Sequence, residues 1–73
     1  SEEGASAMMI REKIRKMIND ELPKQPLSDD AITSQLNSQG LRIARRTVAK
    51  YRKLDSIPSS SQRRRGYQLL AFA

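Results

Sequence analysis

Apolar side chains in the first third of the chain recur at spacings of three and four residues. They are Ala7, Met8, Ile10, Ile14, Met17, Ile18 and Leu22. Charged residues fill the other positions, so the pattern predicts an amphipathic helix over 5–22 whose apolar stripe faces a core. Pro23 and Pro26 end this helix, because the residue before a proline is biased away from the helical conformation. The preceding residues 1–4 are expected to be disordered.

A second helix is predicted from 29 to about 39 by the signals at its two ends. Ser28 is a good N-cap, and Asp29 and Asp30 occupy the first turn, where the helix dipole favours anions. Leu27 and Ile32 have the spacing of a hydrophobic staple, while Ile32 and Leu36 face the core one turn apart. Gly40 is placed to adopt the positive φ of a helix C-terminus.

A short connection over 41–43 leads to a third predicted helix, about 44–54. Pro58 ends any continuation, and the serine- and arginine-rich residues after it have the composition of a mobile segment. We therefore predict an all-α fold: a small three-helix bundle over 5–57 that contains a helix-turn-helix with an extended turn. A basic, flexible tail is predicted over 58–73. Its last seven residues are apolar enough to dock somewhere.

The composition excludes several classes of function. The chain has 73 residues, enough for one small domain, and contains neither cysteine nor histidine. This excludes thiol nucleophiles, disulfides, zinc fingers and imidazole chemistry. No apolar run is long enough to span a membrane, and Glu12, Asp20 and Glu21 argue against a basic helix lying on a membrane surface. The absence of disulfides is compatible with a reducing cytoplasm, where we expect the domain to act. We expect no enzymatic activity, metal or cofactor, since the sequence shows no carboxylate pair suited to acid–base catalysis and no glycine-rich phosphate loop.

The positive charge of the chain is concentrated in its second part. Residues 1–30 hold five basic and seven acidic side chains, whereas residues 31–73 hold nine basic side chains and one acidic, Asp55. A net +8 within 43 residues predicts a positive field over one side of the molecule. Such a field suits a phosphate backbone or anionic lipid, unless it is only a solvated basic surface.

The third predicted helix separates its charged from its apolar side chains. At about 100° per residue, its cations fall in one sector about 160° wide. This basic sector, with the small Ala49 inside it, comprises Arg45, Arg46, Ala49, Lys50, Arg52 and Lys53. Val48, Tyr51 and Leu54 lie with Thr47 in the opposite, apolar sector.

A helix with one anchored and one cationic face fits the major groove of DNA. Arginine in the first turn can bond the O6 and N7 atoms of guanine together, and Ala49 permits close approach or contact with a thymine methyl group. Ala44 stands where a capping Ser or Thr is common, which leaves the first amides for water or a phosphate. An ordinary amphipathic helix with a solvated basic face remains the alternative reading.

The residues of this helix also resemble a known signature. Residues 44–52, Ala-Arg-Arg-Thr-Val-Ala-Lys-Tyr-Arg, resemble letter for letter the RpoN box. That motif belongs to the C-terminal domain of sigma-54, the enhancer-dependent bacterial RNA polymerase sigma factor. Residues 24–29 resemble the family's helix entry and residues 56–64 its C-terminal ending. The similarity runs from about Ala5 to Arg64, and the segment after Arg65 is not part of the pattern.

The resemblance implies a helix that enters the major groove of the GG-containing minus-24 promoter element. It implies that Arg45, Arg46 and Lys50 meet that element, with Arg46 our choice for the guanine, while Val48 and Tyr51 hold the helix on the bundle. It also implies core RNA polymerase and an activator ATPase as partners of regions not present here. We expect an excised, monomeric fragment of a longer chain that binds double-stranded promoter DNA.

Residue roles follow from these two lines of reasoning. Base reading is assigned to Arg45, Arg46, Ala49 and Lys50. Phosphate contact is assigned to Arg42, Thr47, Arg52, Lys53, Arg63, Arg64 and Arg65. Thr47 has a local cap as its alternative, and Arg52 has packing along a neighbouring helix or a pairing with an acid. For Arg42 and Arg63–Arg65 the alternative is a mobile state. Two other functions stay open: a helix-turn-helix repressor or recombinase arm, and a protein-interaction module whose first helix docks a partner.

Overall fold

A computed structural model describes residues 6–71, and its regular elements are helices. They are α1 (Ala7–Asn19), α2 (Asp29–Ser38), α3 (Arg45–Leu54) and α4 (Ser60–Ala71). Within 6–71 the only β pairing is an isolated bridge between Leu22 and Gln25. The all-α class is thus confirmed, with one helix more than predicted. The disorder expected for 1–4 lies outside the described residues.

Both ends of α1 differ from the sequence prediction for physical reasons. Ser6 is the N-cap, its hydroxyl accepting from the Met9 amide at 3.1 Å. At the other end the helix stops at Asn19, three residues before the predicted Leu22. Pro23 has no amide hydrogen to donate to the Asn19 carbonyl and its ring would clash there, so the last turn cannot form.

The caps of α2 are as the sequence predicted. The Ser28 hydroxyl accepts from the Ala31 amide at 3.0 Å, and Gly40 has a φ of +91°. The Leu41 amide donates to the Leu36 carbonyl at 3.0 Å, which closes a Schellman motif around Gly40. Six residues then separate α2 from α3, so the turn is indeed extended.

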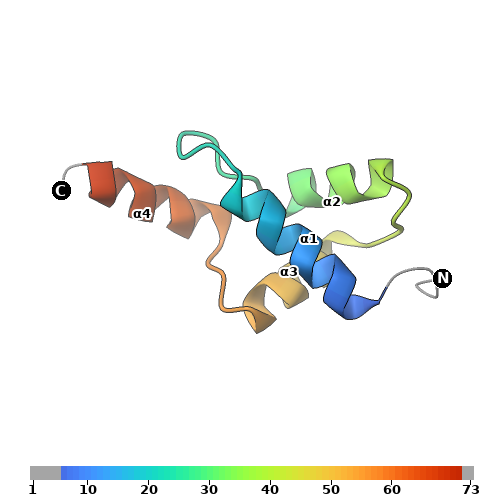
Figure 1. Ribbon diagram of the computed structural model, residues 1–73. Coiled ribbons are helices and arrows are strands. Elements are labelled where there is room, and N and C mark those ends of the chain that lie inside the picture. The colour runs from blue at the N-terminus through green and yellow to red at the C-terminus, as the bar shows by residue number, and fades with distance from the viewer. Residues whose placement is uncertain (1–5, 72–73) are drawn as a thin grey trace.

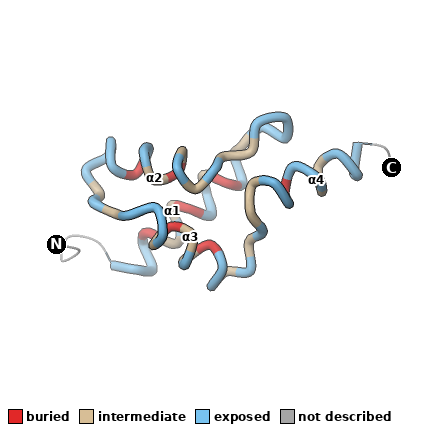
Figure 2. The backbone as a smooth tube through the Cα atoms, turned by 180° about the vertical axis from the view of Figure 1, so that it is seen from behind, coloured by how far each residue is buried: buried red, intermediate tan, exposed pale blue. Residues whose placement is uncertain are grey.

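The core is formed by one face of each of the first three helices. Its buried hydrophobic residues are Ile10, Ile14, Ile18, Ile32, Leu36 and Val48. Half-buried apolar side chains, among them Tyr51 and Ile57, pack around it. In Figure 2 buried positions recur along α1, α2 and α3, whereas α4 is exposed over most of its length. The three-helix bundle of the prediction is therefore present, with α4 added to it.

The segment after Pro58 differs from the predicted flexible tail, because residues Ser60–Ala71 form α4. This helix projects away from the bundle and gives the molecule its long axis of 45 Å against 22 and 17 Å (Figure 1). Arg63 is 7% exposed and attaches α4 to the bundle, whereas Leu69 and Leu70 at its far end are more than 70% exposed. The composition of this segment predicted mobility, whereas the pairing of Arg63 with a buried carboxylate attaches the segment to the bundle.

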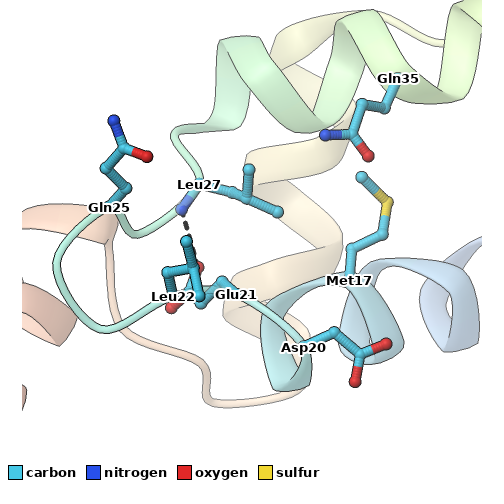
Figure 3. A pocket seen from close by; sticks show the side chains of 7 residues that line it. All are labelled: Met17, Asp20, Glu21, Leu22, Gln25, Leu27 and Gln35. Atoms are coloured by element: carbon cyan, nitrogen blue, oxygen red, sulfur yellow. Dashed lines mark hydrogen bonds between the residues drawn. The ribbon is translucent and has the colours of Figure 1, made fainter.

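A shallow hollow lies where α1 ends and α2 passes over it (Figure 3). Its lining mixes apolar and polar side chains: Met17, Asp20, Glu21, Leu22, Gln25, Leu27 and Gln35. None of the residues predicted to contact DNA lines it.

Candidate nucleic-acid interface

Helix α3 is fixed to the bundle by its apolar side. Val48 is completely buried and Tyr51 packs half-buried against the same core. Ala44 precedes the helix without a side-chain hydrogen bond to its first turn, as the sequence indicated. The opposite side of α3 is therefore the side presented to solvent.

The exposed side of α3 brings together most of the residues predicted to read bases. Arg46, Ala49, Lys50 and Lys53 line one shallow hollow, and Leu54 completes it. The three cations are exposed and Ala49 is half-buried between them. Leu54, which the helical angles place in the apolar sector, is 57% exposed. It lies at the end of that sector nearest Lys50, so the angles alone did not settle its environment.

Arg45, the first residue of α3, lies beside the start of α2. Its Nε is 3.5 Å from Oδ1 of Asp30, and the two side chains are 69% and 77% exposed. An ion pair this exposed contributes about 0–1 kcal/mol, so Arg45 can leave Asp30 for another anion at small cost.

Arg52 is on the same helix but has a different environment. Its guanidinium is 7% exposed and donates through Nε and Nη2 to the two carboxylate oxygens of Asp29, at 3.0 and 3.1 Å. Nη1 donates to the Ile57 carbonyl at 2.9 Å. In the structure Arg52 therefore pairs with an acid, which was an alternative to its predicted phosphate contact.

Arg63 is buried against Glu21, in the connection between α1 and α2. Its Nε and Nη2 donate to the carboxylate at 2.7 and 2.8 Å, and its other donors reach the carbonyls of Leu27 and Pro58. The Tyr67 hydroxyl donates to the same carboxylate at 2.8 Å. Arg63 is therefore a structural residue, and its predicted phosphate contact does not fit this geometry.

The Glu21 carboxylate is fully buried, and its surroundings favour its charged form. Its side chain has no exposed surface, and it also accepts from the Leu27 amide at 2.7 Å (Figure 3). Burial alone would raise the pKa of Glu21, but the hydrogen bonds from Arg63, Leu27 and Tyr67 outweigh it and hold that pKa below its usual range. The hydrogen bond to Glu21 in turn raises the pKa of the Tyr67 hydroxyl.

The single acid of residues 31–73 is also neutralised within the fold. Asp55 follows α3 and pairs with Arg11 of α1, while Arg15 lies 3.8 Å away. The hydrogen bond from Arg11 lowers the pKa of the Asp55 carboxyl. Because 44 residues separate Arg11 from Asp55, no local pattern in the sequence predicted this pair. Its effect is to keep a negative charge at the end of α3 covered by α1.

The remaining predicted contacts lie at three places. Arg42 is exposed in the turn before α3, and Thr47 is half-buried in the first turn of α3. Arg64 and Arg65 are exposed on α4. Across residues 6–71, no helix is both long and apolar enough to cross a membrane.

Comparison with known proteins identifies the family. Residues 1–65 match the family described as "Sigma-54, DNA binding domain". The chain is 56% identical over 68 residues, 93% of its length, to the RNA polymerase sigma-54 factor of Rhizobium meliloti (strain 1021). It is 53% identical over 60 residues, 82% of its length, to the factors of Escherichia coli (strain K12) and Acinetobacter guillouiae. The chain spans 12–13% of the length of these three relatives. By this match over most of its residues, the chain belongs to the sigma-54 DNA-binding domain family.

Proposed function

We propose that this domain binds promoter DNA by placing α3 in the major groove of a GG-containing minus-24 element. The observation that carries the proposal is the exposed hollow on α3, in which three cations surround the small Ala49. Long donors at its rim can reach base edges and phosphates, while the small side chain lets the helix approach. Membership of the sigma-54 DNA-binding domain family supports the same reading.

Within this proposal the cations divide into two groups. Arg46 reads guanine through a bidentate pair, with Arg45 and Lys50 beside it and Ala49 against the base edges. Phosphate contacts come from Arg42, Thr47, Lys53, Arg64 and Arg65. Arg52 and Arg63 are left out, because both guanidinium groups are buried and bonded to carboxylates.

The proposal extends to the setting of the domain. The relatives are named RNA polymerase sigma-54 factors, and we place this domain in a factor that directs RNA polymerase to promoters in the bacterial cytoplasm. Contacts with core polymerase and with an activator ATPase belong to other regions of such a factor. The domain itself acts as a monomer and by binding alone, without catalysis.

A titration of the domain with two duplexes tests the proposal. One duplex carries the minus-24 element and the other has its GG changed to TT. We expect tighter binding of the first, amide shifts concentrated at 40–53, and strong weakening by salt, because phosphate contacts release counterions. Equal affinity for both duplexes would point to a repressor- or recombinase-like domain with another site. An Arg46→Ala variant with unchanged DNA affinity, together with retained polymerase pull-down, would favour the protein-interaction module.

A further inference from the structure

Helix α3 is attached to α2 by directional hydrogen bonds at both of its ends. At the C-terminal end, Arg52 forks onto Asp29, the first residue of α2. Just before the N-terminal end, Asn37 of α2 pairs through its side-chain amide with the backbone of Ile43, which precedes the first residue of α3 by two positions. The Ile43 amide donates to Asn37 Oδ1, and Asn37 Nδ2 donates to the Ile43 carbonyl, both at 3.3 Å.

Between these two attachments the buried contact is apolar, and the exposed Arg45–Asp30 ion pair adds little to it. Val48 packs against the core that contains Ile32 and Leu36, and all three are completely buried. Apolar contact is non-directional, so it decides which side of the helix faces the bundle but sets the exact rotation of the helix about its own axis only loosely. Hydrogen bonds do fix it, because their strength falls steeply with misalignment.

The geometry at Arg52 is that of a residue specialised for orientation. Two parallel bonds to one carboxylate lock the guanidinium plane, and the third bond goes to Ile57, beyond the end of α3. Arg52 also lies at the edge of the basic sector, so a rotation of α3 that broke this fork would turn Arg46 and Lys50 by the same angle. The orientation of the exposed face is thereby tied to a buried pair at the edge of that face.

We infer that Arg52 and Asn37 are positioning residues for base recognition. They set the rotation of α3 so that Arg46 meets its base with both donors, although neither Arg52 nor Asn37 contacts DNA. This inference rests on the proposed function. It assigns the last residue of the 44–52 signature to specificity rather than to phosphate binding.

Arg52→Lys tests this directly, since it keeps the charge but cannot fork onto Asp29. The readouts are affinity for the GG and TT duplexes and the α2–α3 orientation from residual dipolar couplings of the free protein. We expect the GG-to-TT affinity ratio to fall on the order of tenfold, the scale of one bidentate base pair, with affinity for the TT duplex unchanged. We also expect a changed α2–α3 orientation.

Two further variants separate orientation from stability. Asn37→Ser removes the attachment at the other end, where the exposed side chain makes a folding failure less of a concern, and should lower the ratio in the same way. Ile18→Val destabilises the core from α1 without touching either attachment, and should leave the ratio at the wild-type value. Circular dichroism of each variant fixes the folded fraction.

The possible failures are distinguishable. A wild-type domain without preference for the GG duplex overturns the proposed function and this inference with it. A wild-type preference that survives both Arg52→Lys and Asn37→Ser overturns this inference alone. So does a ratio that falls equally in Ile18→Val, because the loss would then follow stability rather than orientation.

Discussion

Three arginines of this chain have three different roles, set by where carboxylates lie. Arg46 is exposed on α3, Arg52 is forked onto Asp29, and Arg63 is forked onto Glu21. The partners of the two buried arginines are 23 and 42 residues away in sequence. An arginine buried without such a partner would be very costly, so each pairing is a condition for its burial. Only the exposed arginine keeps its donors available to an external ligand.

Arg46→Ala should therefore change DNA recognition and leave the fold intact. If Arg46 bonds guanine as proposed, its loss costs about 1–3 kcal/mol of binding free energy and relaxes the preference at that base. Fluorescence anisotropy with duplexes altered at single base pairs measures both effects. Lys53→Ala, about two turns further along the same helix, is the matched control: it should weaken all duplexes alike. A uniform loss in Arg46→Ala would assign Arg46 to phosphate instead.

The Glu21 pair predicts how stability responds to acid. Because hydrogen bonds hold the folded-state pKa of Glu21 below its unfolded value, the carboxylate stabilises the fold above that unfolded value. This contribution is lost as the pH falls through the folded pKa. We expect the free energy of unfolding to decrease below about pH 5, measured by urea denaturation at a series of pH values.

Glu21→Gln should remove this part of the pH dependence. At neutral pH the variant should be less stable by up to about 3 kcal/mol, because Arg63 loses its charged partner in a buried site, and the difference from wild type should shrink in acid. Asp55, whose pKa is also lowered, leaves a residual slope in both proteins. Parallel curves for variant and wild type would show that Glu21 does not carry the effect.

At the scale of elements, local signals in the sequence predicted the helices and their caps well. Ser28, Gly40 and the apolar spacing of α1 and α2 act within one or two turns, and the structure confirms each of them. The basic side of α3 was likewise readable from helical angles, because its exposure depends mainly on where Val48 points.

What the sequence could not supply was the set of pairings between distant residues. The attachment of α4 depends on Glu21 and Arg63, which no local pattern connects, so residues after Pro58 were read from composition alone. The environment of Arg52 depended equally on Asp29, which the sequence had identified only as a first-turn acid. The DNA contacts themselves remain predictions.

The ends of α2 and α3 offer a matched comparison of two Schellman motifs. After α3 the Ile57 amide donates to the Arg52 carbonyl at 3.0 Å, as the Leu41 amide does to the Leu36 carbonyl after α2. Gly40 occupies the left-handed position after α2, whereas Ser56, with a φ of 58°, occupies it after α3. A side chain in this conformation costs roughly 1 kcal/mol relative to glycine. Ser56→Gly should therefore raise the free energy of unfolding by up to about 1 kcal/mol, and Gly40→Ala should lower it by about the same amount. Thermal unfolding measures both.

Space does not explain the expected effect at Gly40, since a Cβ atom built there meets no other atom within 4 Å. The cost is one of backbone conformation alone. If Gly40→Ala were as stable as wild type, or Ser56→Gly less stable, the left-handed positions would not be the source of strain assumed here.

The whole molecule carries its positive charge along its length. The basic side of α3 belongs to the bundle, while Arg64 and Arg65 stand on α4, which extends the long axis to 45 Å. Because the Glu21 pair attaches α4 to the bundle, these two arginines are held at a defined place rather than on a free segment. If a duplex bound by α3 reaches them, as proposed, the contact does not carry the entropic cost of ordering a free tail.

The salt dependence of DNA binding tests this arrangement. If Arg64 and Arg65 both contact phosphates, replacing both by Gln should reduce the slope of log K against log salt by about two units and leave the GG-to-TT ratio unchanged. Lys16→Gln with Lys24→Gln removes the same charge from exposed positions outside the proposed interface, and should change the slope far less. Adding Glu21→Gln to the wild type should reproduce part of the loss, because it releases α4. An unaltered slope in the double arginine variant would confine the DNA contacts to the bundle and leave α4 outside the interface.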